Sequence, residues 1–374
     1  MKTTRRYAAG LAAIVTTTAG LLAGTGLVAG AASAGSLPAF VGPLHHVTTL
    51  ASTVPSNGDV NPYGVAVVPR STGNLGRGNT LVSNFNDKTN AQGTGTTIVQ
   101  ISPGGHVSLF AQINRHLAGC PGGVGLTTAL TVLRSGWVIV GSLPTQGGNV
   151  SGPGCLIVLD RWGHVRETFA GHGINGPWDM ASLDLGSQAV LFVTNVLNGT
   201  VAAKGSTVFG GTVLRLVLQI PQSGLPWIQF NTRIGSGFPE ALNSAALVIG
   251  PTGVGLGPNG VLYVADTLAN RVAGISNAVF RGFSAGRGFT VTRGGHLSNP
   301  LGLVIAPGGD ILTVNSGNGN LVEITPSGSQ IAVRTLDSSG SPPGAGALFG
   351  LAVKPGHRAV YFVDDATNTF ALLH

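Results

Sequence analysis

One stretch of sequence decides the fold: PTGVGLGPNGVLYVADTLANR, at residues 251–271. It contains two short apolar runs joined by a Pro-Asn-Gly turn, which predicts two β-strands, and its second run ends in an Asp-containing loop. Related stretches follow at residues 300–315, PLGLVIAPGGDILTVN, and at residues 348–364, LFGLAVKPGHRAVYFVD. A strand pair that returns about every fifty residues cannot bury both of its faces alone, so we expect it to pack against its own copies.

Three looser copies of this unit precede residue 251. They occupy residues 62–84, 127–142 and 177–195, and each is followed by further apolar runs. Six copies of short strands and turns predict six small sheets, an arrangement typical of an all-β protein. The composition agrees, since 60 of the 374 residues are glycine and only 9% are charged.

The sixth copy has no fourth strand after it, and a matching run lies near the other end of the sequence. HVTTLA at residues 46–51 resembles the fourth strands at 106–111 and 164–170 in its opening His-Val pair and in its alternation. We therefore expect residues 46–51 to complete the last blade and to close the ring without a free sheet edge. The predicted fold class is an all-β, six-bladed β-propeller that occupies residues 46–374.

The repeated pattern, P-x-G-[LV]-x-[LV]-x-P-x-G-x-[LI]-x-V-x-[DN], resembles the NHL repeat, and the chain is similar to exported six-bladed NHL-type β-propellers. The resemblance covers residues 46–374. It implies four-stranded blades around a central channel, with ligand sites on the face where the first strands begin. The loops between second and third strands project on that face, and they are longest at 85–96, 143–154 and 196–211. We therefore expect the binding function over the first half of the ring.

The first 34 residues predict an export signal. They contain a basic start, an uncharged apolar run at residues 8–30 and an A-x-A cleavage site at residues 32–34, the three parts of a secretory signal peptide. A retained membrane anchor is the competing interpretation, and two adjacent arginines in the basic start leave the twin-arginine export route open. Residues 35–45 are expected to form a short leader before the propeller.

Charge and cysteine content narrow the class of protein further. Removal of the signal would leave 17 basic and 13 acidic residues, a formal charge of +4. The Lys and Arg residues are scattered without a run, so neither nucleic acid nor an anionic membrane is the expected partner. Cys120 and Cys155 are an even pair in a chain expected to be exported, which predicts a disulfide.

The residue between Pro and Gly at the start of each inner strand is expected to face the mouth of the channel. These residues are Tyr63, Thr128, Trp178, Thr252, Leu301 and Phe349. In propellers similar to lactonases and to the calcium-dependent gluconolactonase group, this ring supplies oxygen ligands to a divalent cation. Here it contains no carboxylate, and Asp179, which replaces the usual glycine, is the nearest acid. We expect no metal and no cofactor, and either an aromatic plug or an apolar ligand pocket.

A second ring of short polar residues ends the second strand of each copy. Its members are Asn84, Ser142, Asn195, Asp266, Asn315 and Asp364. One such residue per blade at a fixed place indicates a structural role, in which a side-chain oxygen accepts backbone N–H groups of the following loop. Asp266 and the Asp364–Asp365 pair are the acids to inspect first for a further role. Lyase-type propellers use histidines near the channel, but this sequence has no His-x-His or Glu-x-His pattern.

Together these features predict an exported, monomeric propeller that acts as a binding or scaffold module. Its partner, a protein, glycan or small molecule, is expected on the long-loop face. The alternative is a propeller enzyme, a lyase or a lactonase-like hydrolase, that acts on a small apolar substrate at the channel mouth. In that case Asp179 is the candidate acid or base.

Overall fold

The computed structural model describes residues 38–146, 149–244 and 246–374. The predicted signal peptide at residues 1–34 lies outside the described residues, and so do residues 35–37. The regular secondary structure of the described chain is almost entirely β-strand, and its 3-10 helix, η1, spans Thr267–Ala269. In this part of the chain no helix has the length and apolar character needed to cross a lipid bilayer.

The strands form six main sheets, the blades, and each blade contains consecutive antiparallel strands. Blade 1 has β2 (Val60–Val67), β3 (Thr80–Asn86), β4 (Thr97–Ile101) and β5 (Val107–Gln112); blade 2 has β6 (Leu126–Val132), β7 (Val138–Ser142), β10 (Cys155–Leu159) and β11 (Val165–Phe169). Blade 3 has β12 (Gly176–Asp184), β13 (Gln188–Val196), β14 (Val208–Gln219), β15 (Trp227–Asn243) and the short β16 (Leu247–Ile249). A two-stranded hairpin, β8 (Thr145–Gln146) and β9 (Asn149–Val150), projects from blade 2.

The second half of the ring follows the same order. Blade 4 has β17 (Pro251–Leu256), β18 (Leu262–Asp266), β19 (Arg271–Ile275) and β20 (Phe289–Arg293). Blade 5 has β21 (Pro300–Ile305), β22 (Ile311–Asn315), β23 (Asn320–Ile324) and β24 (Gln330–Thr335). Blade 6 has β25 (Leu348–Val353), β26 (Val360–Asp364) and β27 (Thr369–Leu373), and it is completed by β1 (Val47–Ser52) from the other end of the chain.

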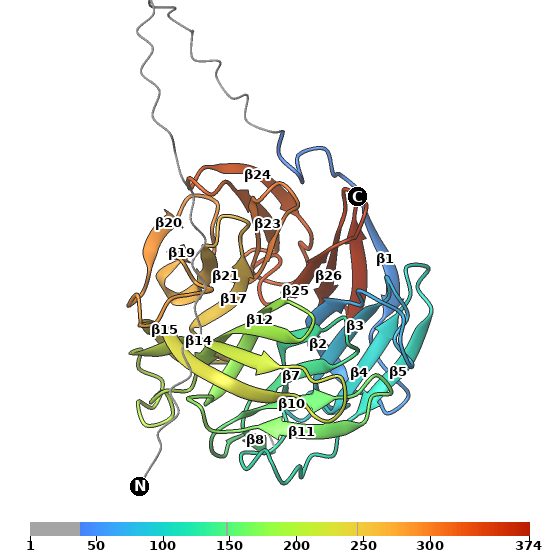
Figure 1. The fold of residues 1–374 in the computed structure, drawn as a ribbon. Helices are drawn as coiled ribbons and strands as arrows, with labels where there is room; N and C mark the ends of the chain where they lie inside the picture. Colours follow the sequence, from blue (N-terminus) through green and yellow to red (C-terminus); the bar gives the residue numbers. More distant parts are fainter. Residues whose placement is uncertain (1–37, 147–148, 245) are drawn as a thin grey trace, which may run out of the picture. The chain divides into compact units, whose positions relative to one another are not determined.

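The blades stand around a central axis with their first strands innermost (Figure 1). Each of the inner strands β2, β6, β12, β17, β21 and β25 contacts the inner strands of both neighbouring blades, which closes the ring. Strand β1 pairs with β27, and Val47 lies opposite Leu373. The predicted six-bladed propeller and its closure by the N-terminal strand are therefore confirmed.

Glycine follows four of the six channel-mouth residues, in blades 1, 4, 5 and 6, and it has a steric reason there. A Cβ atom added to Gly302 would lie 1.9 Å from the carbonyl oxygen of Phe349, and one added to Gly350 would lie 2.2 Å from that of Tyr63. Inner strands of adjacent blades thus approach so closely that a side chain would clash with backbone. Asp179 occupies the equivalent position in blade 3, where the repeat elsewhere favours glycine.

Residues 38–45, within the segment expected to be a leader, pack against blades 5 and 6. The carboxylate of Glu323 accepts hydrogen bonds from the backbone N–H groups of Phe40, at 2.5 Å, and Val41, at 2.8 Å. Val41 and Leu44 are buried in the core cluster that these two blades share. Residues 38–45 therefore contribute to the apolar core.

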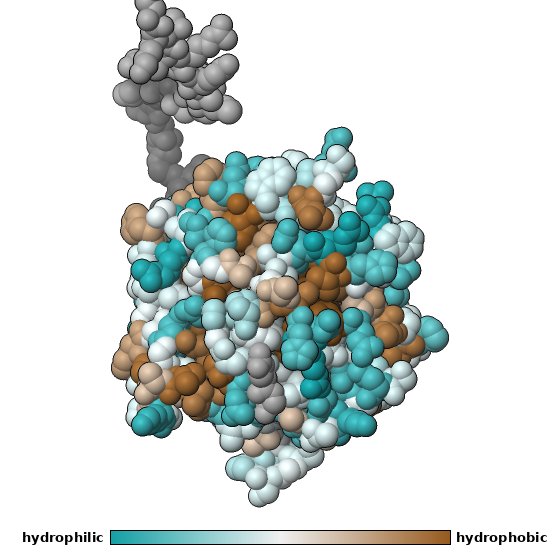
Figure 2. Space-filling model, turned by 90° about the horizontal axis from the view of Figure 1, so that it is seen from below, coloured by the Kyte–Doolittle hydropathy of each residue, from teal (hydrophilic) through white to brown (hydrophobic). Residues whose placement is uncertain are grey.

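Cys120 and Cys155 form the predicted disulfide, which joins the loop before blade 2 to β10. Both residues are buried. On the surface shown in Figure 2, hydrophobic residues lie between hydrophilic ones in several separate places. Such a surface follows from the composition, because a chain with so few charged residues must expose many neutral and apolar groups.

Candidate functional site

The structure places the six predicted channel-mouth residues below the surface. All of them are at most 4% exposed. The ring of Tyr63 stacks between those of Phe85 and Phe349, at centroid distances of 4.4 and 4.1 Å. The indole Nε1 of Trp178 donates a hydrogen bond of 3.0 Å to the carbonyl of Val248. These aromatic side chains belong to one apolar core cluster, so they form a plug across one end of the channel.

The plug is covered by parts of the long loops. Strand β16, which lies outside the four-strand repeat of blade 3, contributes Leu247, Val248 and Ile249 to the same cluster. The loop at 85–96 contacts the cover on two sides, because Thr145 donates to the carbonyl of Gly93 and Gln92 donates to that of Ser244. The cover excludes these aromatic rings from solvent, and beside it a pocket of about 310 Å³ is lined by Leu301 and Phe349 together with Ala246 and Ile249.

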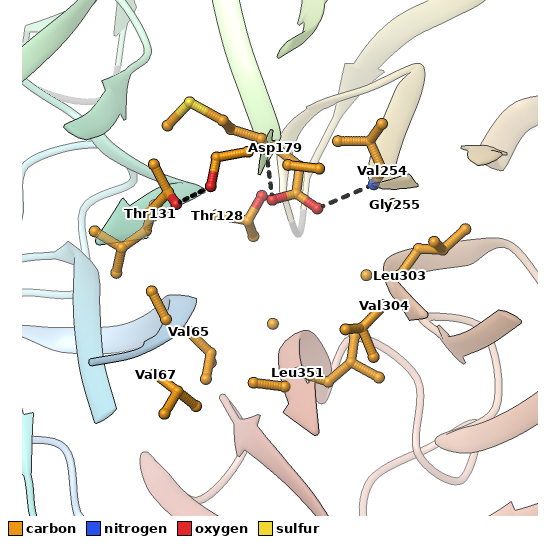
Figure 3. A pocket seen from close by; sticks show the side chains of 18 of the residues that line it. Val65, Val67, Thr128, Thr131, Asp179, Val254, Gly255, Leu303, Val304 and Leu351 are labelled. Carbon is orange, nitrogen blue, oxygen red and sulfur yellow. Dashed lines mark hydrogen bonds between the residues drawn. The ribbon is translucent and has the colours of Figure 1, made fainter. Parts of the chain in front are cut away.

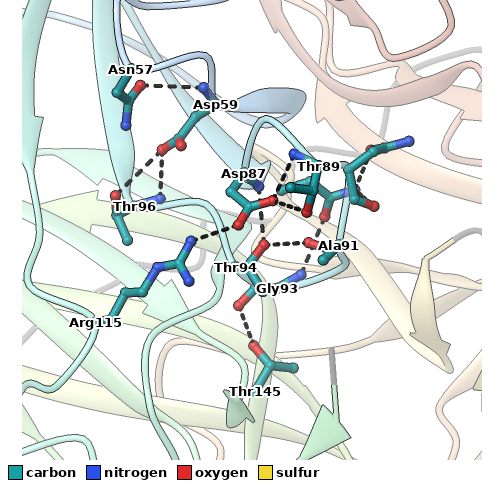
Figure 4. Close-up of polar contacts among 12 residues, drawn as sticks. Asn57, Asp59, Asp87, Thr89, Ala91, Gly93, Thr94, Thr96, Arg115 and Thr145 are labelled. Carbon is teal, nitrogen blue, oxygen red and sulfur yellow. Dashed lines mark hydrogen bonds and ion pairs between the residues drawn. The ribbon is translucent and has the colours of Figure 1, made fainter. Parts of the chain in front are cut away.

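The loop at 85–96 is itself held by a polar network (Figure 4). The carboxylate of Asp59 accepts hydrogen bonds from the backbone N–H of Thr96, at 2.8 Å, and from the hydroxyl of Thr97, at 2.9 Å. Arg115 and Asp87 form an ion pair at 2.9 Å. The predicted binding face therefore consists of loops that are fixed to the ring and to one another.

The open part of the channel lies on the other side of the plug, towards the ends of the inner strands. It is a cavity of about 380 Å³ lined by residues of all six inner strands. Most of its lining is aliphatic, and the polar side chains among the lining residues are Thr128, Thr131, Asp179 and Ser182. These four come from β6 and β12 alone. Figure 3 shows Asp179, Thr128 and Thr131 on one wall and the aliphatic residues Val65, Val67 and Leu351 on the opposite wall.

Asp179 is the acid in this cavity. Its Oδ1 accepts a hydrogen bond of 2.8 Å from the N–H of Met180, and its Oδ2 accepts one of 3.2 Å from the N–H of Val254 in the next blade. Burial raises the pKa of the Asp179 carboxyl to about 8, although these backbone hydrogen bonds and one from Thr128 oppose the shift. At neutral pH the group is therefore a protonated, uncharged acid that has an O–H to donate.

Sequence reasoning singled out Asp179 but missed Thr131 and Ser182, whose hydroxyl oxygens lie 2.7 Å apart in the same wall. Both residues lie at the far end of their strands, away from the expected mouth. Polar residues at inward-facing positions of two neighbouring inner strands were the signal that could have found them.

The second predicted ring makes hydrogen bonds at every blade, mostly to the segment that enters the blade rather than to the loop that follows. Asn195 Oδ1 accepts from the N–H groups of Asn175, at 2.8 Å, and Gly176, at 3.0 Å. Three other members also bind the entering segment. The amide groups of Asn84 and Asn315 donate hydrogen bonds to the carbonyls of Thr53 and His296, and the hydroxyl oxygen of Ser142 accepts one from the N–H of Gly125. Asp364 follows the expected pattern and accepts from the N–H of Thr367.

Asp266 has different partners. Its buried carboxylate accepts hydrogen bonds from Arg271 Nε at 2.7 Å and from Arg287 at 3.1 Å. Next to Asp364, burial and then the neighbouring Asp364 carboxylate raise the pKa of Asp365 to about 7. Among the described residues, no three His, Cys, Asp or Glu side chains come close enough together to hold a metal ion.

Comparison with known proteins supports the fold and goes no further. No family model matches the chain, and no curated protein matches it. The resemblance to NHL repeats therefore stays a prediction.

Several solved structures share the architecture. A gluconolactonase from Xanthomonas campestris is 12% identical with a TM-score of 0.54, over 87% of this chain and 88% of that one. A streptogramin B lyase is 14% identical with a TM-score of 0.51, over 88% and 97% of the two chains. A calcium-binding regucalcin from Agrobacterium tumefaciens is 13% identical with a TM-score of 0.51, over 87% and 93%. The feature that these proteins share with the chain is the six-bladed propeller.

Proposed function

We propose that this protein binds a small, mostly apolar molecule in its central channel, with Asp179 as the polar anchor. The observation that carries the proposal is that Asp179 places a carboxyl in the cavity at a position where blades 1, 4, 5 and 6 have a glycine. A departure from a local structural rule is expected mainly where function requires it.

The chemistry of the cavity fits such a ligand. Its volume of about 380 Å³ suits a molecule of modest size, and the aliphatic walls of blades 1, 4, 5 and 6 favour an apolar body. The protonated carboxyl of Asp179 can donate a hydrogen bond to a ligand carbonyl. We therefore infer a ligand with an apolar frame and one oxygen acceptor.

A second candidate function is acid–base catalysis at the same place. A carboxyl whose pKa lies at about 8 is suited to give and to take a proton near neutral pH. A lyase and a gluconolactonase have this fold, so catalysis is compatible with it. They say nothing more about this chain, because a shared fold does not carry a shared activity. The substrate of such an enzyme would be a small lactone or ester that fits the apolar channel.

Export and a role for the long-loop face remain part of the proposal. A buried disulfide is compatible with an oxidising compartment, where the predicted signal peptide would direct the chain. The loops at 85–96, 143–154 and 196–211 supply a surface on which a protein or glycan partner could dock, and we propose a monomer that uses the face in this way.

The test compares two molecules of nearly equal shape, acetophenone and ethylbenzene, which differ in the carbonyl oxygen. Binding measured by saturation-transfer NMR should favour acetophenone, and Asp179→Gly should weaken acetophenone binding roughly three- to tenfold, the effect of one hydrogen bond. Ethylbenzene binding should change little. Asp184→Asn, on the same strand but outside the cavity lining, is the matched control.

The possible results separate the two functions. If neither molecule binds, the channel is not a ligand site. If both bind equally and Asp179→Gly has no effect, the cavity binds apolar molecules without the proposed anchor. Hydrolysis of δ-valerolactone by the native protein that disappears in Asp179→Asn would favour the enzyme, and no turnover would exclude lactone hydrolysis of this kind.

A further inference from the structure

The net positive charge of the chain after the predicted signal is concentrated in residues 185–309, which run from the turn before β13 of blade 3 to the turn after β21 of blade 5. Residues 185–309 contain seven Lys and Arg residues and two acids, Glu240 and Asp266. Outside this segment, residues 35–184 and 310–374 contain ten basic and eleven acidic residues, so they are close to neutral. The excess of basic over acidic residues, which is small for the whole chain, therefore lies on one side of the ring.

Burial makes the surface of this segment more positive, because both of its acids are removed from the surface. Glu240 and Asp266 are each 0% exposed. Glu240 accepts a hydrogen bond of 2.8 Å from the N–H of Asn198, and Asp266 binds Arg271 and Arg287. Arg233 and Arg293 remain exposed. The described surface of residues 185–309 thus carries cations and no exposed carboxylate.

The same surface also exposes large aromatic side chains. Five of the chain's 14 phenylalanines lie within this segment and are at least half exposed: Phe280 (80%), Phe283 (74%), Phe209 (67%), Phe230 (60%) and Phe289 (50%). We call these five residues, together with Arg281, Arg287 and Arg293, the aromatic rim. A cluster of large apolar side chains exposed to water is typical of an interaction surface.

The rings are brought together by the connection between β19 and β20, which crosses the outer strand of blade 3. The N–H of Ala285 donates to the carbonyl of Ile234 at 2.8 Å, and the hydroxyls of Ser284 and Ser236 lie 2.7 Å apart. Both contacts join the segment next to Phe283 to β15. Strands β15 and β20 accordingly lie at the same edge of the ring in Figure 1.

Two further contacts place the remaining rings on this edge. Phe230 is opposite Val217 in the ladder between β14 and β15, and Val217 and Val279 pack against one core cluster. The guanidinium of Arg287 lies 5.9 Å from the ring centroid of Phe209, and that of Arg281 lies 5.3 Å from that of Phe283. Cations are thus stacked directly on exposed aromatic rings, an arrangement that keeps both at the surface.

We propose that the aromatic rim docks on an anionic lipid surface. Protruding rings such as Phe280 and Phe283 can enter the headgroup layer without a matching pocket, whereas a folded protein partner would have to supply one. The arginines beside them attract anionic headgroups, and no exposed carboxylate in the segment opposes that attraction. A soluble polyanion would use the arginines but would leave the phenylalanines in water.

The test is sedimentation of the full chain with vesicles. The protein should bind vesicles of equimolar phosphatidylcholine and phosphatidylglycerol, bind pure phosphatidylcholine weakly, and lose affinity as salt is raised. The double substitution Phe280→Ser with Phe283→Ser should lower partitioning about tenfold, and Arg281→Gln with Arg293→Gln should lower it roughly fivefold for each arginine.

Matched controls come from blade 1. Leu109 on its outer strand is 52% exposed, so Leu109→Ser removes an exposed apolar group elsewhere on the ring edge. Arg70→Gln with Arg77→Gln removes two charges there, and both control variants should bind vesicles as the native protein does. The proposal is overturned if anionic vesicles bind no protein or if the controls weaken binding equally. Equal binding to soluble polyglutamate, unaffected by the phenylalanine substitutions, would also overturn it.

Discussion

The carboxyl of Asp179 makes the stability of the propeller depend on pH in an unusual direction. In the folded protein burial raises the pKa of this group to about 8, against an ordinary value of about 4 in an unfolded chain. Between these values the unfolded chain loses the proton while the folded chain keeps it. Rising pH therefore favours unfolding, and the stability associated with this group is complete below about pH 4 and is lost by about pH 8.

The magnitude follows from the difference in pKa. About four pKa units at roughly 1.4 kcal/mol each give an upper limit of about 6 kcal/mol for the full range. The side chain is partly open to the channel, where water would screen the charge, so we expect about 2–4 kcal/mol. Asp179→Asn cannot titrate, and its free energy of unfolding should lack this part of the pH dependence.

The assay is urea unfolding of the native protein and of Asp179→Asn at a series of pH values from about 5 to about 8. The difference between the two free energies of unfolding isolates Asp179 from other buried acids, such as Glu240, whose pKa burial raises to about 7. Thr131→Val, which alters the channel without removing a titrating group, should run parallel to the native protein. Parallel curves for Asp179→Asn and native protein would refute the reasoning.

Three further predictions concern the fold. Gly302→Ala places a Cβ 1.9 Å from the Phe349 carbonyl oxygen and should lower the free energy of unfolding by more than about 3 kcal/mol in the same assay; a normal midpoint would show that adjacent blades can move apart. Replacing Cys120 and Cys155, 35 residues apart, by serine should cost about 4 kcal/mol in the chain-entropy model, and a change below about 1 kcal/mol would contradict it. A chain that starts at Thr53 lacks β1 and leaves the edge of β27 unpaired; it should aggregate on size-exclusion chromatography, whereas a stable monomer would show that the closure is dispensable.

Much of the fold could be read from the sequence because it depends on local patterns. The turn in each copy and the alternation of apolar residues define strands whatever surrounds them. The His-Val pair at residues 46–47 was enough to predict which strand closes the ring. Asp179 was also recognisable, because it breaks the glycine rule of its own repeat.

The position of the open cavity could not be read in this way. Whether a residue such as Trp178 lines a pocket or fills a plug depends on what lies above it, and the cover comes from β16, an addition outside the repeat. The elevated pKa of Asp179 likewise comes from burial by neighbouring blades.

The distribution of charge on the surface also depended on the tertiary structure. The sequence by itself determined the strands, their order around the ring and the pairing of two cysteines, because each follows from spacing along one chain. Only the tertiary structure decided which end of the channel is open and which charges remain at the surface. Both depend on contacts between residues far apart in the sequence, as when Glu240 turns inward to hold Asn198.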